Sequence, residues 1–459
     1  MLARKIVRLG AAAGLVLSLG IAGSLTGASA REAAAIPGTF RSSIVVANPG
    51  TTTANVTMSF VKADGTQAIT PLAFTVASNS SVNRYVPGIA GLADGRYSVV
   101  IDSDQAVVAI ANLTSDNPTT STAYNGIAQS EVGTSFNMPA AYKNYYGFSS
   151  SYVIQNAGSA TANVTITYRT SSGVVTTETR QIASNASVTV DQSLTSGLPD
   201  GFGGSATISS DQSVAAIFLV SASGQLSSAR GARTGATTVN LPSVYNQYAG
   251  YNSAVTVQNI GSASTNVRVE YFSSTTGASL GTESKSVAAG ASAIFLQFDG
   301  TDRTAILRPG QAGSAVVTSV PENVIAFTNI QYPAQNYLES YNGFLTSSAT
   351  TRVSCAAIMN NYYNYNTALT VMNVGSAATN LTIHFINSSG TVVSTQNVTN
   401  LQPNSSHVRW NPNDGIPVGF LGAAVVTSSG SPIIAIVNEL YGTGSESGDQ
   451  LFAYACANN

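Results

Sequence analysis

The stretch MNNYYNYNTALTVMNVGSAATN, residues Met359–Asn380, joins two different patterns. Its first half gathers tyrosines and asparagines, and its second half alternates apolar with polar residues. Alternation with a period of two is typical of a β-strand that buries one face. The stretch therefore predicts a strand entered through a Tyr/Asn-rich loop, and it raises the question whether that loop is a hinge or a ligand site.

The same arrangement occurs four times in the chain. Each copy has an asparagine, a glycine two residues later and a second asparagine seven residues after the first; the asparagine pairs are Asn48/Asn55, Asn156/Asn163, Asn259/Asn266 and Asn373/Asn380. Successive first asparagines lie 108, 103 and 114 residues apart. A period of about 100 residues is too long for a solenoid unit and fits a string of complete domains. We expect the Asn-x-Gly segment to end a strand at a turn that needs positive φ.

Each repeat shows about seven short alternating segments separated by turn residues, which is the size and pattern of a β-sandwich. No sustained 3.6-residue apolar stripe occurs outside the N-terminal segment. The sequence thus predicts an all-β chain of four tandem immunoglobulin-like β-sandwich domains in line, as a rod. The expected limits are a signal peptide at 1–30 and repeats one to four at 31–130, 131–233, 234–346 and 347–459.

The N-terminus has the three parts of a secretory signal peptide. Arg4, Lys5 and Arg8 precede an apolar run that ends at Ala28-Ser29-Ala30, a small-x-small cleavage pattern. The alternative is a membrane anchor, but the run is short and rich in Gly and Ala. We therefore expect a secreted protein at the extracellular cell surface, with no membrane span in the mature chain.

The mature chain carries little charge. Removal of 1–30 takes three basic residues and no acidic ones, which leaves 16 basic and 21 acidic residues and a net charge of −5. Charged residues make up 9% of the whole sequence, against about 25% in an average soluble protein. Without a basic patch to neutralise phosphates, nucleic acid is excluded as an expected partner.

Two cysteines occur, Cys355 near the start of the fourth repeat and Cys456 near its end. In an exported domain such a pair predicts a disulfide bond. The bond would join the first and last strands of that repeat.

Three segments carry a resemblance to a known repeat: NNYYNYNTALTVMNVGSAATNLTI, GIPVGFLGAAVVTSSGSPIIAIVNE and SYNGF. Together they resemble a repeat of secreted surface proteins of filamentous bacteria. The resemblance covers all four repeats and is best in repeats two to four; repeat one has Pro37 in place of a tyrosine and lacks the Tyr/Asn cluster. It implies an exported tandem β-sandwich protein and no established activity.

Signatures of an enzyme are scarce, and we expect none, with no catalytic residue, metal or cofactor. The two histidines, His384 and His407, lie on alternating segments that place the first outward and the second half-buried. Neither accompanies a recognisable nucleophile, and no His or Cys spacing matches a zinc site. A hydrolase is therefore the third class after the two considered next.

The Tyr/Asn cluster leaves two functions open. Eleven residues before the first asparagine stands Tyr145, Tyr248 or Tyr362 in repeats two to four, and a tyrosine found only where a domain precedes suggests an interdomain contact. We therefore expect a non-enzymatic structural or adhesive protein whose partners are a cell-surface polymer, its own copies or other surface proteins. The alternative is an array of carbohydrate-binding modules that uses the same tyrosines as glycan contacts.

Asn-x-Ser/Thr triplets mark candidate glycosylation sites, although many arise by chance in so Asn-rich a chain. They are Asn55, Asn79, Asn112, Asn163, Asn185, Asn380, Asn387, Asn397 and Asn404.

Overall fold

A computed structural model describes residues 5–14, 39–116, 119–298, 305–442 and 448–458. Its regular structure consists of β-strands and five single-turn 3₁₀ helices, without an α-helix in these ranges. The all-β prediction is confirmed. No helix in the described ranges is long and apolar enough to cross a membrane.

Each repeat has two sets of strands, one that carries the outer hairpin and one nearer the centre. The two sets are separate sheets in repeats one, three and four, whereas in repeat two the long strand β15 belongs to both and joins them into one seven-stranded sheet. The strands follow in hydrogen-bonded order. Repeat one contains β4 (Leu72–Val76), β3 (Ala54–Val61), β6 (Gly95–Ser103), β1 (Lys5–Gly14) and β9 (Ile127–Ala128), with β5 (Ser80–Tyr85), β2 (Phe40–Asn48), β7 (Val108–Asp116) and β8 (Thr119–Asn125). Repeat two contains β13 (Gly173–Ile182), β12 (Ala162–Thr170), β15 (Phe202–Ala222) and β10 (Gly133–Lys143), with β14 (Ser187–Asp191), β11 (Ser149–Asn156), β15 again and β16 (Gln225–Arg230).

Repeats three and four follow the same scheme. Repeat three contains β20 (Ser279–Val287), β19 (Thr265–Ser273), β22 (Gln311–Val320), β17 (Thr238–Asn246) and β25 (Phe344–Leu345), with β21 (Ser292–Leu296), β18 (Asn252–Asn259), β23 (Val324–Tyr332) and β24 (Tyr337–Asn342). Repeat four contains β29 (Val392–Leu401), β28 (Thr379–Asn387), β31 (Phe420–Ser428), β26 (Arg352–Asn360) and β34 (Ala457–Asn458), with β30 (Ser406–Trp410), β27 (Tyr365–Asn373), β32 (Ile433–Tyr441) and β33 (Leu451–Ala455). The 3₁₀ turns are η1 (Val86–Gly88), η2 (Gln192–Leu194), η3 (Pro333–Gln335), η4 (Thr346–Ser348) and η5 (Asn411–Asn413).

The partition of strands is the same in all four repeats and differs from that of an immunoglobulin domain. In repeat four the first, third, fourth and sixth strands (β26, β28, β29, β31) share one sheet, and the second, fifth, seventh and eighth (β27, β30, β32, β33) share the other. An immunoglobulin domain instead places its first, second, fourth and fifth strands together. The sandwich description holds, whereas the immunoglobulin-like label does not describe this strand order.

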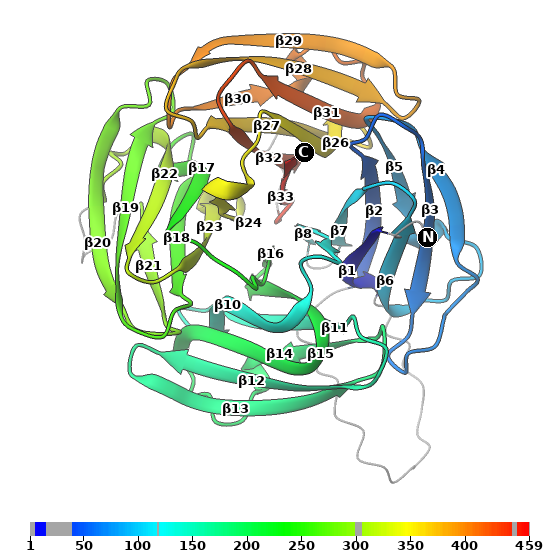
Figure 1. Cartoon of the computed structure of the whole chain (residues 1–459), viewed down its shortest axis with the longest axis vertical. Helices are drawn as coiled ribbons and strands as arrows, with labels where there is room; N and C mark the ends of the chain where they lie inside the picture. Colours follow the sequence, from blue (N-terminus) through cyan, green and yellow to red (C-terminus); the bar gives the residue numbers. More distant parts are fainter. Residues whose placement is uncertain (1–4, 15–38, 117–118, 299–304, 443–447, 459) are drawn as a thin grey trace.

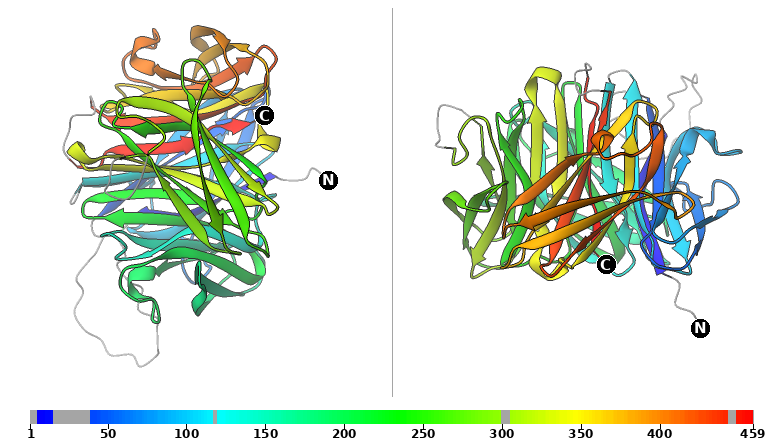
Figure 2. Two further views of the ribbon diagram at one scale, coloured as in Figure 1. Left: turned by 90° about the vertical axis from the view of Figure 1, so that its left-hand side faces the viewer. Right: turned by 90° about the horizontal axis from the view of Figure 1, so that it is seen from above.

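The four repeats form a closed ring, so the predicted rod is wrong. Figure 1 shows hairpins such as β28–β29 at the rim and the strands β8, β16, β24 and β33 around the centre. Seen edge-on in Figure 2, the strands run obliquely between the two faces of the ring. The last repeat returns to the first: the side-chain amide of Asn125 donates to the carbonyl of Ala455 at 2.7 Å and accepts from its N–H at 2.9 Å.

Apolar cores that cross the seams explain why the chain closes. Val45 and Ile110 of repeat one pack into the core of repeat four, and Ile434 of repeat four packs into the core of repeat three. At the seam of repeats two and three, the rings of Phe218 and Phe327 meet edge-to-face with centroids 5.0 Å apart. A row of separate domains would leave these side chains in water, at a cost of about 25 cal/mol for each Å² of apolar surface.

The repeated Asn-x-Gly segment has a different cause from the one expected. Asn156 is fully buried; its amide donates to the carbonyls of Ala160 at 2.7 Å and Ile182 at 2.9 Å, while its side-chain oxygen accepts the N–H of Gly158 at 2.8 Å. The same three bonds occur at the other first asparagines, Asn48, Asn259 and Asn373. None of the four glycines has positive φ. At Gly158 the reason for glycine is space, because a Cβ would lie 2.6 Å from the side-chain oxygen of Gln212.

Two further predictions concern the chain ends. Cys355 and Cys456 form a disulfide bond, which ties β26 to the segment between β33 and β34. The predicted signal peptide, 1–30, falls mostly outside the described residues; Lys5–Gly14 forms β1, antiparallel to β6. Cleavage after residue 30 and the predicted domain limits therefore stay predictions.

Candidate functional site

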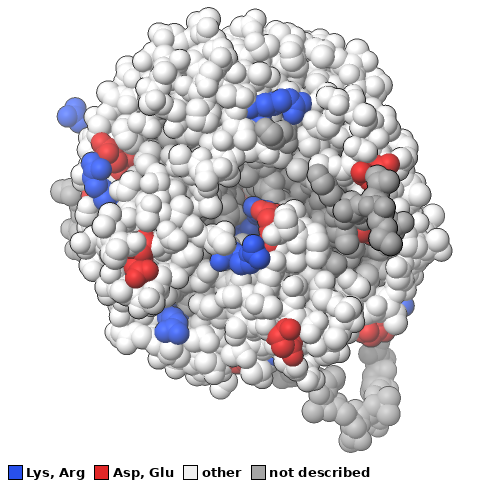
Figure 3. All heavy atoms as spheres, in the orientation of Figure 1, with Lys and Arg blue, Asp and Glu red and all other residues white. Residues whose placement is uncertain are grey.

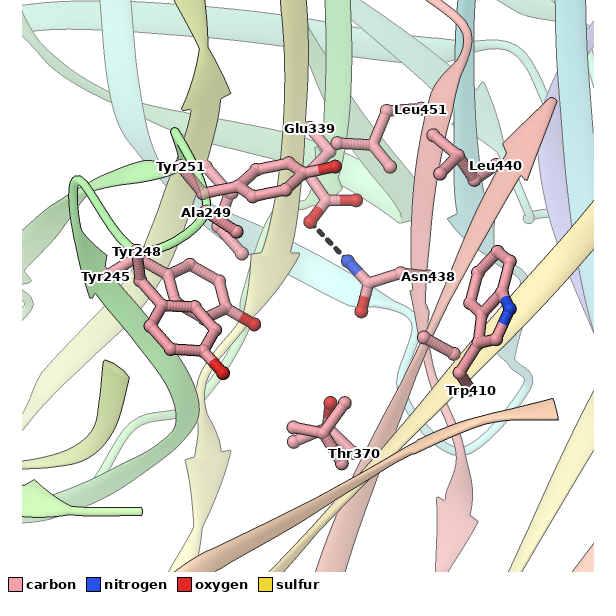
Figure 4. Close-up of a pocket in the computed structure, with 13 residues that line it drawn as sticks. Tyr245, Tyr248, Ala249, Tyr251, Glu339, Thr370, Trp410, Asn438, Leu440 and Leu451 are labelled. Atoms are coloured by element: carbon pink, nitrogen blue, oxygen red, sulfur yellow. Dashed lines mark hydrogen bonds between the residues drawn. The ribbon is translucent and has the colours of Figure 1, made fainter. Parts of the chain in front are cut away.

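A pocket of about 300 Å³ opens at the seam between repeats three and four. Figure 4 shows tyrosines of repeat three on one side and Trp410 of repeat four on the other, with Thr370 between them. We call it the seam pocket. Its thirteen lining residues are Tyr245, Tyr248, Ala249, Tyr251, Ile330, Glu339, Ala368, Thr370, Val408, Trp410, Asn438, Leu440 and Leu451.

A tight hairpin positions the tyrosines. β17 and β18 are joined through Tyr248 and Tyr251, whose backbone groups exchange hydrogen bonds of 3.1 and 2.9 Å. The two residues between them, Ala249 and Gly250, both have positive φ, as a two-residue type I′ turn requires. The rings of Tyr245 and Tyr248 stack with centroids 5.9 Å apart. Tyr248 stays 47% exposed, so its ring forms the lip of the pocket.

An acid and an amide from different repeats meet inside the pocket. Glu339 on β24 is only 2% exposed, and its Oε1 accepts a hydrogen bond from the side-chain amide of Asn438 on β32. Its second oxygen, Oε2, has no hydrogen-bond partner among the described residues. Burial, and after it the charge of Asp449, raise the pKa of Glu339 well above its ordinary value. Burial therefore favours the protonated, neutral form of this acid.

Tyr251 adds a hydroxyl beside this acid. Figure 4 shows its hydroxyl end next to the carboxyl of Glu339 and the hydroxyls of Tyr245 and Tyr248 directed into the cavity. Burial, and after it the charge of Glu339, raise the pKa of Tyr251. Convergent polar groups between apolar walls are the usual make-up of a ligand site.

A second acid–amide pair lies at the seam between repeat four and repeat one. Its acid is on β32, whereas Glu339 is on β24. Glu439 on β32 is 1% exposed and accepts from the side-chain amide of Asn112 at 2.6 Å. In its sheet Glu439 lies opposite Phe452, whereas Glu339 lies opposite Ile330. Burial raises the pKa of Glu439 to about 8.

Asp449 joins all four repeats at the centre. Its carboxylate accepts the N–H of Leu226 at 2.7 Å and of Leu338 at 3.0 Å, from repeats two and three. Its backbone carbonyl accepts the hydroxyl of Ser121 of repeat one at 2.9 Å. Burial raises the pKa of Asp449 well above its ordinary value. These contacts make Asp449 a structural hub rather than a ligand contact.

The structure treats the three predicted tyrosines differently. Tyr248 lines the seam with the following repeat, not with the preceding one. Tyr145 stacks on Tyr142 with centroids 5.5 Å apart, and Tyr362 meets Tyr363 edge-to-face at 4.7 Å; both neighbours belong to the tyrosine's own repeat. An interdomain or ligand role for Tyr145 and Tyr362 stays a prediction.

The next residue in two of these turns is a tyrosine in an unusual conformation. Tyr146 and Tyr363 have φ of 50° and 48° and are 87% and 80% exposed. A left-handed conformation is uncommon for a bulky residue and costs energy. In both repeats the turn joins the first two strands, β10 to β11 and β26 to β27.

The remaining predicted residues lie away from the seam pocket. His384 bonds to Thr395 on an exposed surface, and burial lowers the pKa of half-buried His407. No group of three or more His, Cys, Asp or Glu in the described part of the chain could hold a metal ion. Of the candidate glycosylation sites, Asn112 is engaged with Glu439, and the exposed ones are Asn55, Asn163, Asn380 and Asn397. Glycosylation stays a prediction.

Sequence reasoning missed Glu339, Asn438, Trp410 and Glu439. A usable signal was present for the acids, since each lies in a short strand segment between apolar or aromatic residues, in YLESYN and in IIAIVNELY. An acid in such a strand must find a partner or change its pKa. Nothing local indicates which repeat supplies that partner.

Comparisons with known proteins give a family match for part of the chain. Residues 17–193, less than half of it, match a family described as "Family of unknown function (DUF5719)". No curated protein matches. Among solved structures, the chain is similar to Thermotoga maritima 1070 (14% identity, 24% of this chain and 95% of that one, TM-score 0.20). Another is a Bacteroides ovatus mixed-linkage glucan protein, SGBP-B, in complex with a heptasaccharide (10% identity, 82% and 89%, TM-score 0.12). A third is the serine-rich repeat protein Srr2 from Streptococcus agalactiae (10% identity, 76% and 85%, TM-score 0.13).

Proposed function

We propose that this protein is a non-enzymatic recognition protein of the extracellular cell surface that binds a sugar residue of a surface glycan in the seam pocket. The observation that carries the proposal is the convergence of Glu339, Asn438 and the Tyr251 hydroxyl between aromatic side chains of two repeats. Sugars present hydroxyls at their edges and C–H groups on their faces. Polar groups between aromatic walls suit both.

Charge and compartment support the same function. Charged side chains are few and scattered on the face of the ring shown in Figure 3, so this face offers no basic patch to a polyanion such as nucleic acid. The disulfide between Cys355 and Cys456 and the signal-like N-terminus fit an exported protein. The resemblance of the repeats to those of secreted surface proteins points the same way.

Affinity electrophoresis in gels containing surface polysaccharides tests the proposal. We expect at least one polysaccharide to retard the wild-type protein and Tyr248→Ala to abolish that retardation. Tyr146→Ala is the matched control, because it removes a more exposed tyrosine from the corresponding hairpin of repeat two without touching the seam pocket. Retardation of Tyr248→Ala equal to that of wild type would contradict the proposal.

A second candidate, adhesion by self-assembly, is favoured by the exposed tyrosines in left-handed turns. Tyr146 and Tyr363 pay a conformational cost without burying their rings, so each ring is available for a partner surface. Replacing both with glycine relieves the backbone and removes the rings. Sedimentation velocity should show assembly in the wild type and its loss in the double variant; a monomeric wild type would rule this candidate out.

A further inference from the structure

The seam pocket has acidic and acceptor groups without any basic counterpart. None of its thirteen lining residues is Lys, Arg or His. Glu339 is one of the thirteen, and its buried Oε2 has no hydrogen-bond partner among the described residues. The charged group that acts on the pKa of Glu339, Asp449, is also acidic. Asp449 is itself satisfied by backbone N–H groups rather than by a cation. No positive charge among the lining residues would therefore balance Glu339 in its ionised form.

The other polar groups at the pocket also favour a cation. Asn438 uses one of its two amide N–H groups to donate to Glu339, and its side-chain carbonyl oxygen is an acceptor. Tyr248 and Tyr251 present phenol oxygens, and Trp410 stands on the opposite wall. Ammonium groups are donors only and are also attracted to Tyr and Trp faces. Oxygen acceptors and aromatic rings around one acid form a site for such a group.

We propose that the seam pocket recognises a protonated amino group, with Glu339 as its counter-ion, on a sugar that carries a free amine. This inference rests on the proposed function, because it names the class of sugar that the same pocket holds. An N-acetylated sugar of the same skeleton lacks the positive charge and leaves Oε2 of Glu339 without a counter-ion.

Proton exchange follows from this pairing. Burial raises the pKa of Glu339 and so favours the protonated acid, and an ammonium ion that pairs with the carboxylate displaces that proton. The groups packed around the acid, Tyr245, Tyr251 and Asp449, all have raised pKa values for the same reason. An amine should consequently bind more tightly as the pH rises from 5 to 7, with release of a proton.

Isothermal titration calorimetry of the full-length protein tests the inference with three probes: a β-1,4-linked glucosamine tetramer, its fully N-acetylated counterpart and 1,4-diaminobutane. We expect the glucosamine tetramer to bind at least tenfold more tightly than the acetylated one. Titrations in two buffers of different ionisation enthalpy should show proton release in the wild type, a readout that needs no variant.

Glu339→Gln supplies the second arm, because glutamine keeps the volume and the oxygen that accepts from Asn438 but cannot be ionised. The preference for the free amine should disappear in this variant, and the matched control Glu439→Gln, at the other seam, should keep it. Equal binding of the two tetramers, or an unchanged preference in Glu339→Gln, would overturn the inference.

The outcomes separate this inference from the proposed function. If both tetramers bind equally and Tyr248→Ala abolishes binding, the glycan function stands and the amine preference falls. If diaminobutane binds and no sugar does, the amine site stands and the glycan function falls. Failure of all three probes to bind overturns the inference whatever the electrophoresis shows.

Discussion

The stability of the ring should fall as the pH rises through the neutral range, and Glu439 offers the sharpest test. The carboxyl is 1% exposed, and its pKa is raised by burial from 4.5 to about 8. The folded state therefore binds this proton over a range in which the unfolded chain has lost it. The stabilisation is fully present below pH 4.5 and is lost as the pH rises to about 8, because the unfolded state then binds fewer protons.

The magnitude follows from the size of the shift. Each pKa unit corresponds to about 1.4 kcal/mol, so the rise from 4.5 to about 8 gives an upper limit of about 5 kcal/mol for this one residue. Glu439→Gln mimics the protonated acid and keeps the oxygen that accepts from Asn112. We expect the variant to match wild type near pH 4.5 and to be more stable by several kcal/mol at pH 9.

Guanidinium unfolding followed by the fluorescence of Trp410, the single tryptophan, measures the difference at each pH. Glu339 and Asp449 remain in both proteins, so their contributions cancel in the comparison. The nearby tyrosines, Tyr365 and Tyr454, have pKa values raised by burial and stay neutral over this range. Parallel stability–pH curves for wild type and Glu439→Gln would refute the reasoning, because they would show that Glu439 does not change its pKa on folding.

Four further predictions follow from the ring and its repeated bonds. Small-angle scattering should give a radius of gyration of about 23 Å, the value for a compact chain of this length, and a much larger value would restore the rod. Replacing both Cys355 and Cys456 by alanine should destabilise the fold by about 4 kcal/mol, since the bond closes a loop with a sequence separation of 101; equal denaturation midpoints would contradict this. Asn259→Ala leaves buried carbonyls such as that of Val287 without a donor, so thermal unfolding should show a loss of about 2–4 kcal/mol, against near-neutral Asn397→Ala at an exposed site. Residues 133–232 expressed alone should show β-type circular dichroism but self-associate in sedimentation, because seam residues such as Phe218 become exposed; a stable monomer would show that the seams add little.

Much of the local structure could be predicted because it depends on neighbours in the sequence. Alternation in ANVTITYRT, residues 162–170, indicates a strand with one buried face, and the structure shows that pattern at the rim, in β12. The disulfide bond could also be predicted without tertiary information, because both cysteines of the chain lie in the fourth repeat. Repetition in the sequence correctly identified the Asn-x-Gly segments as important. We expected a turn with positive φ there, whereas the structure shows three hydrogen bonds made by each buried asparagine side chain.

The strands, the fourfold repetition and the pairing of the cysteines could all be predicted from the sequence, since a period of two and a recurring segment are local properties of the chain. Closure of the repeats into a ring could not be predicted in this way, because it depends on packing between repeats. Apolar runs such as IIAIV, residues 433–437, indicate a strand that is buried on both faces. The run does not say whether the second face is covered by a sheet of the same repeat or by a neighbouring repeat. The seam pocket depends on that choice, because Glu339 and Asn438 lie 99 residues apart and meet only when one repeat packs on the next.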